Sequence, residues 1–327
     1  MAYWFLGGGL VLLLFGSDAI VRGGVAISRA LNLSPLVIGL LVITAGTSAP
    51  EFAVSLQAAE SGLPDIALAN IIGSNILNLL LILGLAAVIR PLPSSPKVVL
   101  RDGGAMLIAA AALAIMSRGS AITRLDGLMM LGAFALYIAA IFFSDWRRSA
   151  EHSVPCARAV QHLQNGAPSG AAGVFLLLFG FVGLTVGAHF TVAGAEAVAR
   201  EFHLSQATIG LTAVAFGASV PELVVTLVAA VRRQTHLAIG HLIGSNVFNV
   251  LGALGATAAI VPLKVNPALQ VDLLAMGAAS ALIVPLLISR WRLSRPRGAL
   301  LVLSYACYLL FVAWRQGLVA PSMIGLG

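Results

Sequence analysis

The chain has very little charge. Only 9% of its 327 residues are Asp, Glu, Lys or Arg, whereas 59% are hydrophobic, and the mean hydropathy is +1.00. About a quarter of the residues of a typical soluble domain are charged. The composition therefore excludes a soluble domain and indicates a membrane protein with several spans.

Cysteine and catalytic motifs are scarce as well. The two cysteines, Cys156 and Cys307, lie too far apart in the expected topology to form a disulfide or a metal pair. No Cys/His nucleophile arrangement or phosphate-binding loop is present, so we do not expect an enzyme or a resident cofactor. A cleavable signal pattern is also lacking, because the first apolar stretch continues past Asp18 and Arg22. We expect that stretch to remain as a membrane span.

Apolar stretches make up most of the chain. A helix needs roughly 17–25 apolar residues to cross a bilayer. Ten stretches meet this length: 3–22, 36–58, 66–89, 99–117, 125–144, 171–195, 207–231, 237–261, 269–289 and 298–315. Five lie in residues 1–146 and five in 170–327, and the polar segment 147–169 between them is expected to be a cytoplasmic linker.

The odd number of spans in each half has a topological consequence. The second half must enter the membrane from the opposite side, as in the inverted repeats of secondary transporters. With both termini outside, fourteen of the nineteen Lys and Arg residues fall inside, which fits the positive-inside bias. The formal charge of +7 then reflects topology and not nucleic-acid binding. We predict an all-α membrane protein of ten transmembrane helices, in two inverted five-helix repeats with both termini outside.

One polar block occurs twice. GTSAPEF…IIGSNILN in the first half returns as GASVPEL…LIGSNVFN at a constant offset of 171. The offset relates Ser48 to Ser219, Glu51 to Glu222, Ser74 to Ser245 and Asn78 to Asn249. A carboxylate inside a membrane is costly and usually functional. The duplication therefore predicts one site built from two halves.

The residue types in this block suit a hard cation. Ser48 lies three residues before Glu51, so the two side chains share a helix face. Pro50 has no amide proton and frees a carbonyl one turn earlier, and Pro221 repeats the effect. Carboxylates, hydroxyls and carbonyls together form an oxygen-only site, which is what Ca²⁺ prefers and which also suits Na⁺. No Lys or Arg lies in residues 30–89 to pair with the carboxylate.

Two histidines interrupt the symmetry of the halves. His189 and His241 stand where the first half has Asp18 and Asn70. They could be proton or ion-pathway groups, but we favour core histidines with satisfied hydrogen bonds, because the duplication argument does not cover them. Asp18 either lines an entrance or pairs with Arg22 one turn away.

Other polar residues of the spans have structural interpretations. Asn75 and Asn246 lie off the face of the duplicated Ser and Asn, so packing or backbone bonding is favoured for them. Asp65 and His236 lie at expected helix starts, where such residues commonly act as caps.

The paired motifs G-[TA]-S-x-P-E and G-S-N-x-x-N resemble those of the cation/calcium exchangers, specifically the prokaryotic sodium/calcium exchanger type with two inverted alpha-repeats. The resemblance covers nearly the whole chain. It implies ten helices, with the second and third of each half packed around ion sites at the membrane centre. It also implies that the long first and sixth helices slide to give alternating access.

The resemblance also implies ligands for the transported Ca²⁺ and Na⁺. Calcium would be bound by Glu51 and Glu222 together with the backbone carbonyls of Thr47 and Ala218. The remaining ligands would serve sodium or the central pair: the hydroxyls of Ser48, Ser74, Ser219 and Ser245, the carbonyls of Thr44 and Ala215, and the amides of Asn78 and Asn249.

The sequence departs from the family pattern at two positions. Ala218 stands where the family often has Thr, which removes a hydroxyl and leaves the carbonyl. Asn249 stands where many prokaryotic relatives carry Asp, so the site keeps two formal negative charges, from Glu51 and Glu222. One Ca²⁺ would then be neutralised, whereas three Na⁺ would leave one positive charge. This predicts electrogenic exchange.

Two alternatives follow from the residues. Either glutamate could carry protons, which would make the protein an H⁺/Ca²⁺ antiporter. A protein of another class, an ion channel or a non-transporting membrane scaffold, could use the same cage as a structural ion site. Because one chain holds both halves of the site, a monomer is sufficient and no protein partner is expected. The expected location is the prokaryotic inner or plasma membrane.

Overall fold

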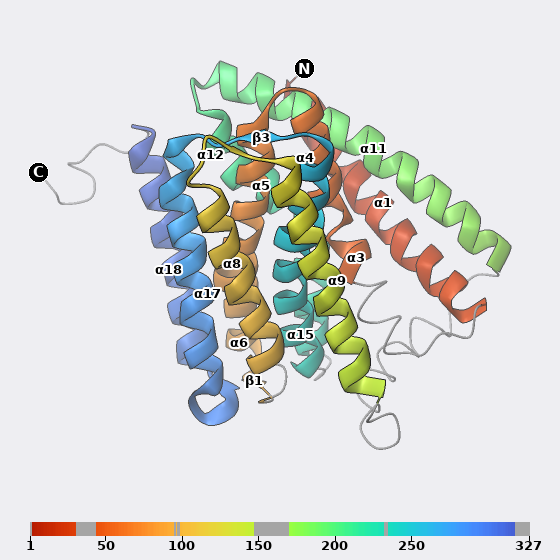
Figure 1. Cartoon of the computed structure of the whole chain (residues 1–327), viewed down its shortest axis with the longest axis vertical. Coiled ribbons are helices and arrows are strands. Elements are labelled where there is room, and N and C mark those ends of the chain that lie inside the picture. Colours follow the sequence, from red (N-terminus) through yellow and green to blue (C-terminus); the bar gives the residue numbers. More distant parts are fainter. Residues whose placement is uncertain are drawn as a thin grey trace, which may run out of the picture.

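The computed structural model describes residues 2–30, 44–94, 96, 99–146, 170–231 and 235–317. The predicted linker 147–169 with Cys156, and the start of the second predicted span, lie outside the described residues. The rest forms a helical bundle with two short strand pairs (Figure 1).

The first half follows the predicted spans closely. Its elements are α1 (Ala2–Ala30), α3 (Thr44–Thr47), α4 (Ala49–Glu60), α5 (Pro64–Ile76), η2 (Leu77–Ile82), α6 (Leu83–Ile89), β1 (Leu92–Pro93), η3 (Val99–Gly103), α8 (Gly104–Met116), β2 (Ala121–Ile122) and α9 (Arg124–Trp146). Proline at the first position of α5 fits a helix start, because the amide that it lacks would have no partner there.

The second half repeats this order. Its elements are α11 (Gly170–Glu201), α12 (Gln206–Ile209), η4 (Gly210–Val214), α13 (Ala215–Ala218), α14 (Val220–Val231), α15 (Thr235–Val247), η5 (Phe248–Leu254), α16 (Gly255–Ile260), β3 (Leu263–Lys264), η6 (Pro267–Leu269), α17 (Gln270–Ile288), η7 (Ser289–Trp291), β4 (Arg292–Leu293) and α18 (Arg295–Arg315). The π-helices η2 and η5 begin near the duplicated asparagines, and such π segments are frequent at functional sites.

Membrane-spanning helices dominate the described residues. Eight helices are long and apolar enough to cross a bilayer, and the bent pair 206–218 and 220–231 makes a ninth if it counts as one span. The remaining predicted span is described only from residue 44 onward. The coarse prediction of a multi-spanning α-helical protein is confirmed.

Two helices form the centre of the bundle. In an 18-residue stretch of the span from α5 to α6, 83% of the residues are buried, and the corresponding figure for the span from α15 to α16 is 78%. No other of the eight spans exceeds 39%. The duplicated residues of the second motif therefore lie on the two most enclosed of these spans: Ser74, Asn78, Ser245 and Asn249.

The long helices α1 and α11 pack against each other at one side of the bundle (Figure 1). They run antiparallel and approach closely at small residues. A Cβ added to Gly16 would lie 2.9 Å from the backbone N of Leu184, and one added to Gly187 would lie 2.9 Å from the backbone N of Leu13. Gly16 and Gly187 are equivalent at the offset of 171. Such glycines let helix backbones touch in membranes.

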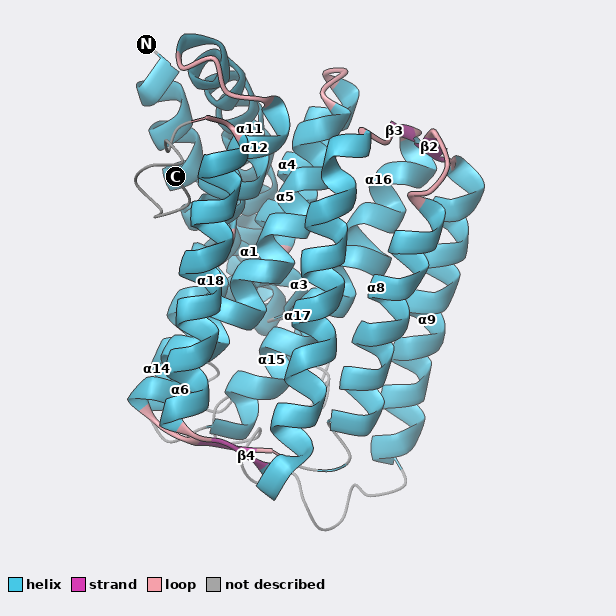
Figure 2. Cartoon of the chain, turned by 90° about the vertical axis from the view of Figure 1, so that its left-hand side faces the viewer, coloured by secondary structure: helices cyan, strands magenta, loops and turns pink. Residues whose placement is uncertain are grey.

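The strand pairs mark the two ends of the bundle. β1 pairs with β4 and β2 pairs with β3, both antiparallel, and Figure 2 places β4 and the β2–β3 pair at opposite ends. A shift of 171 residues converts β1 into β3 and β2 into β4. α5 contacts β3, whereas α15 contacts β1. We call these the β2–β3 end and the β1–β4 end.

Candidate cation site

Each half contains a helix broken at a serine. In the first half, Ser48 has φ −85° and ψ 6° between α3 and α4. In the second, Ser219 has φ −85° and ψ 9° between α13 and α14, with a bend of 48° across the break. Pro50 and Pro221 each follow two residues later and cannot donate the helical hydrogen bond. The breaks put a duplicated glutamate in the first turn of α4 and of α14.

The two glutamates meet the serines of the opposite half. The Ser219 hydroxyl donates to Glu51 Oε1 at 2.7 Å, and the Ser48 hydroxyl donates to Glu222 Oε1 at 2.7 Å. All four side chains are fully buried. In the described structure, the Oε2 atom of each glutamate has no hydrogen-bond partner. The halves therefore share one site, and each carboxylate keeps one oxygen for a ligand.

Four asparagines join α5 and η2 to α15 and η5. The Asn75 amide donates to the backbone carbonyl of Asn246 at 3.4 Å, and the Asn246 amide donates to the carbonyl of Asn75 at 3.3 Å. This confirms the predicted backbone bonding. Asn78 donates to Asn246 Oδ1 at 3.0 Å, and Asn249 donates to Asn75 Oδ1 at 3.1 Å.

These bonds orient the inner pair of amides. Asn78 and Asn249 use their NH₂ groups on the outer asparagines, while their buried Oδ1 atoms have no partner among the described residues. The positioning role of Asn75 and Asn246 was missed in the sequence, although their duplication three residues before the inner pair is a signal that could have shown it.

The other predicted ligands lie around this centre and are buried. Ser74 donates to the carbonyl of Ala215 at 3.4 Å, whereas the hydroxyl of Ser245 has no partner in the part of the chain that the structure describes. Thr47 donates to the carbonyl of Thr44 at 3.1 Å. Thr47 and Ala218 each end the helix before a break.

Helix α1 also contacts the first break. The hydroxyl of Ser17 donates to the carbonyl of Gly46 at 2.7 Å, which is the carbonyl that Pro50 leaves without its helical partner. The equivalent position in α11 is Ala188, which has no hydroxyl. Sequence reasoning missed Ser17, since it lies outside the duplicated motifs.

The electrostatics of the site favour a cation. The ion pairs found in the described residues lie elsewhere: Asp18–Arg22, Arg101–Asp102, Glu196–Arg200 and Asp272–Arg315. Burying a carboxylate costs several kcal/mol unless an opposite charge compensates it. The unpartnered atoms at the centre are carboxylate, amide and hydroxyl oxygens, which are ligands for hard cations such as Ca²⁺ and Na⁺.

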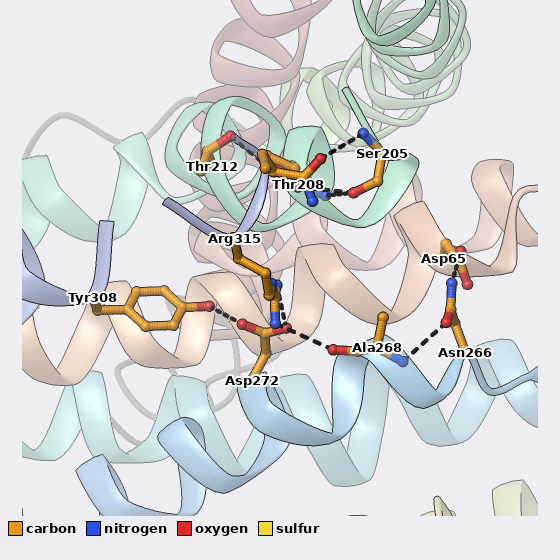
Figure 3. Close-up of polar contacts among 10 residues, drawn as sticks. Asp65, Ser205, Thr208, Thr212, Asn266, Ala268, Asp272, Tyr308 and Arg315 are labelled. Atoms are coloured by element: carbon orange, nitrogen blue, oxygen red, sulfur yellow. Dashed lines mark hydrogen bonds and ion pairs between the residues drawn. The ribbon is translucent and has the colours of Figure 1, made fainter. Parts of the chain in front are cut away.

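A buried acid is held by a tyrosine and an arginine in each half, outside the central site. Figure 3 shows that Tyr308 and Arg315 of α18 both reach Asp272 of α17, at 3.0 and 2.8 Å. In the first half, Tyr137 donates to Asp102 at 3.2 Å, and Arg101 pairs with the same carboxylate at 2.6 Å. These groups were missed in the sequence, and they hold α17 to α18 and η3 to α9.

Three predictions for residues outside the motifs need correction. His189 is exposed on α11 and is not a core residue, because this face of α11 points away from the bundle. His241 is buried, but its Nε2 atom has no partner among the described residues, so it is not satisfied. Asp65 is not an N-cap, because the N-cap of α5 is Leu63. The Asp65 carboxylate instead accepts a hydrogen bond from Asn266 at 2.8 Å (Figure 3).

The predictions for two other residues have different outcomes. The His236 side chain lies outside the described part. Asp18 forms an ion pair with Arg22 at 2.8 Å.

Comparison with known proteins gives the relatives of the chain. The family described as "Sodium/calcium exchanger protein" matches residues 1–143 and 172–314. Inner membrane protein YrbG of Escherichia coli is 34% identical over 262 residues, covering 79% of this chain and 80% of YrbG. Sodium/calcium exchanger MaX1 of Methanosarcina acetivorans is 29% identical over 339 residues, covering 92% of this chain and 95% of MaX1.

A solved structure is also similar. The sodium-calcium exchanger NCX_Mj, soaked with Na⁺ and Sr²⁺, is 31% identical, with a TM-score of 0.65. The match covers 94% of this chain and 97% of that chain. The likeness therefore spans both halves of the fold.

Proposed function

The chain belongs to the sodium/calcium exchanger protein family and is a multi-pass membrane antiporter of Na⁺ and Ca²⁺; we propose that one site between Glu51 and Glu222 carries the exchange. The observation that carries this proposal is the crossed pair of serine–glutamate hydrogen bonds at 2.7 Å. It brings two buried carboxylates from different halves into one cage, and no ion pair found in the described residues involves either of them. The ions transported are substrates, and the family is one of transporters and not of catalysts.

We assign the ligands by charge and geometry. Ca²⁺ is bound by the free Oε2 atoms of Glu51 and Glu222, because a dication is neutralised by two carboxylates. The carbonyls of Thr47 and Ala218, at the helix breaks, complete its coordination. The sodium ions use the surrounding oxygens: Ser48, Ser74, Ser219, Ser245, the carbonyls of Thr44 and Ala215, and the amide oxygens of Asn78 and Asn249. The two cations compete because both sets line one cage, in which Ser48 and Ser219 are hydrogen-bonded to the two glutamates.

The proposed architecture is ten helices in two inverted repeats, 1–146 and 170–327, joined by the linker 147–169, with both termini outside. The exchange of strand partners under the 171-residue shift supports it. The contacts of α5 with β3 and of α15 with β1 support it as well, because they lie at opposite ends of the bundle. One chain supplies both halves of the site, so a monomer is sufficient for exchange.

The proposed transport cycle is alternating access. α1 and α11 contact each other closely through glycines, so the pair can move as one unit when it slides past the central helices. With two carboxylates in the site, three Na⁺ against one Ca²⁺ moves one net charge. About 100 mV across the membrane is then worth roughly 2.3 kcal/mol. We expect the equilibrium Ca²⁺ gradient to shift about 50-fold at that voltage, measured in vesicles with a K⁺/valinomycin potential. A gradient that ignores the potential would exclude this stoichiometry.

The experiment that tests the function is uptake of radioactive Ca²⁺ into proteoliposomes. The vesicles are loaded with Na⁺, K⁺ or choline at the same pH on both sides, and wild type is compared with Glu51→Gln. We expect uptake only with internal Na⁺ and only in wild type. Uptake that ignores Na⁺ and follows an imposed pH gradient would instead identify a proton-coupled exchanger. Non-saturating uptake without any counter-cation would identify a channel.

A further inference from the structure

The two halves differ one helical turn away from the central site. In the first half, protein hydrogen bonds join α4 to α5 in this region, and Asn70 Oδ1 is left without a partner among the described residues. The Asn70 amide donates to the Glu51 carbonyl and to the Ser55 hydroxyl, both at 3.0 Å. Ser55 in turn donates to the carbonyl of Ala67 at 3.2 Å. This chain of bonds fastens α4 to α5 at the β2–β3 end.

The equivalent region of the second half is also polar and buried, but the described residues do not form the same hydrogen bonds there. Thr226 replaces Ser55 and His241 replaces Asn70 at the offset of 171. Thr226 is fully buried and His241 is 5% exposed. Among the described residues, neither Thr226 Oγ1 nor His241 Nε2 has a hydrogen-bond partner. Two buried polar atoms thus occupy the positions at which the first half makes a 3.0 Å contact.

Such atoms are expensive unless something binds them. An unsatisfied buried donor or acceptor costs about 1–3 kcal/mol, and ordered water satisfies many of these groups in native proteins. A buried water makes about three hydrogen bonds. The hydroxyl of Thr226 and one nitrogen of His241 supply two. The carbonyl of Glu222 is the equivalent of the Glu51 carbonyl to which Asn70 donates, and it supplies the third.

The chemistry of the pair selects water over a cation. Na⁺ and Ca²⁺ prefer several oxygen ligands, and this position offers one hydroxyl and one imidazole nitrogen. Water can donate or accept toward both, in either tautomer of the histidine. Thr226 lies one turn beyond Glu222 on α14, and His241 lies one turn before Ser245 on α15. The pair therefore adjoins the central site on the side toward the β1–β4 end.

We propose that Thr226 and His241 hold a buried water molecule that hydrates cations entering or leaving the central site at the β1–β4 end. The step rests on the proposed function of the central site. A cation that leaves Glu222 toward this end meets a water ligand within one helical turn. At the β2–β3 end, the Asn70 amide and the Ser55 hydroxyl already bind each other, so of this pair only Asn70 Oδ1 has no partner among the described residues. Rehydration is therefore faster at one end of the protein than at the other.

The direct test is a high-resolution structure of the full chain in lipid. We expect a water with oxygen about 2.7–3.2 Å from both Thr226 Oγ1 and His241 Nε2. The proposal is overturned if Thr226 donates to the carbonyl of Ala238, as Ser55 does to Ala67, and His241 bonds to protein atoms. Radiolytic hydroxyl labelling followed by mass spectrometry gives a second readout, because bound water at His241 should make this buried residue react.

The functional test exchanges the residues at these equivalent positions between the two halves. The double variant Thr226→Ser/His241→Asn copies the first half and should close the water position. We expect Ca²⁺ release toward the β1–β4 end to slow about tenfold, equivalent to about 1.4 kcal/mol, with little change in equilibrium Ca²⁺ affinity. The isosteric variant Thr226→Val removes one water ligand with little change in volume and should slow the same step. Unchanged release in both variants overturns the proposal.

The reciprocal variant Ser55→Thr/Asn70→His is the matched control. It should create a water position on the other side and speed release toward the β2–β3 end, and no change in that rate counts against the proposal. These outcomes are separable from a failure of the proposed function. If wild type does not exchange Na⁺ for Ca²⁺, the structure and the labelling experiment still show whether the water is bound.

Discussion

The two halves of the chain agree at the glutamates and differ one turn away. At the centre, each serine donates to the glutamate of the other half at the same distance, and the asparagines repeat the crossing. Beyond this centre, Asn70 donates to Glu51 and Ser55, whereas Nε2 of the equivalent residue, His241, has no partner among the described residues. At the proposed site, both halves contribute equivalent residues to one cage. The residues on the two sides of that site, toward the two ends of the bundle, do not share this constraint and differ between the halves.

Removing either carboxylate should have the largest effect. Glu51→Gln and Glu222→Gln each delete half of the charge that opposes the dication, so we expect Ca²⁺ exchange to fall at least about 100-fold, or about 2.7 kcal/mol. The measurement is Na⁺-dependent Ca²⁺ uptake in proteoliposomes. Glu196→Gln is the control, because that glutamate pairs with Arg200 at 2.5 Å away from the site, and its uptake should be normal. Residual exchange in only one of the two site variants would break the equivalence of the halves.

Removing one serine hydroxyl should have a smaller effect that crosses between the halves. A hydrogen bond to a charged group is worth about 1.5–3 kcal/mol, so Ser48→Ala and Ser219→Ala should each weaken cation binding about tenfold or more. Titration calorimetry with Ca²⁺ and with Na⁺ measures this. Ser304→Ala serves as the control, since its hydroxyl donates to the carbonyl of Leu300 on exposed α18. Unequal losses at the two positions would mean that the cation lies closer to one half.

Adding a carboxylate to the inner asparagine pair should change the pH response. Asn249→Asp introduces a third ionisable group next to the cage, so exchange should become more dependent on pH and should respond differently to membrane potential. Asn78→Asp is the matched variant, and the symmetry predicts the same change. Uptake measured between pH 6 and pH 9 tests both. A pH profile identical to wild type would place that asparagine outside the cation site.

The smallest effect is expected at the contact between α1 and the first helix break. Ser17→Ala removes one neutral hydrogen bond, worth about 0.5–1.5 kcal/mol, and should shift the balance between the two access states about two- to tenfold. Ala188→Ser offers the same hydroxyl to the second break and should shift the balance in the opposite direction. Accessibility of engineered cysteines on both sides of the membrane reports the balance. Shifts of the same sign would show that the Ser17 contact is not a difference between the halves.

Much of the fold and site could be predicted from the sequence. The spans follow from hydrophobic length, and the 171-residue repeat identifies Glu51 and Glu222, because copied polar residues in apolar helices stand out against their surroundings. The family is confirmed by the comparisons. The crossed bonding could not be predicted, since a repeat tells which residues are equivalent but not which residues of the two copies touch.

The predictions were wrong where the sequence pattern indicates that a residue is buried but not which residues it contacts. His241 was expected to be both buried and satisfied. Burial follows from the helix face, but hydrogen bonding depends on the neighbouring helix, where Thr226 replaces Ser55 and has no partner for its hydroxyl among the described residues. His189 was placed in the core although α11 packs with α1 at the side of the bundle and exposes this residue. Asp102 and Asp272 were missed because their offset of 170 breaks the register of the motifs by one residue.

The reciprocal amide bonds of Asn75 and Asn246 bear on motion. Each of these residues donates to the backbone of the other. The pair therefore lies where equivalent residues of the two halves meet. A motion in which the two halves exchange conformations leaves such a contact in place. Asn78 and Asn249 donate to this pair, so we expect their oxygens to keep their place beneath the proposed cation site throughout the proposed cycle. In that cycle α1 and α11 are the parts that move, and the amide pair is the fixed frame against which they slide.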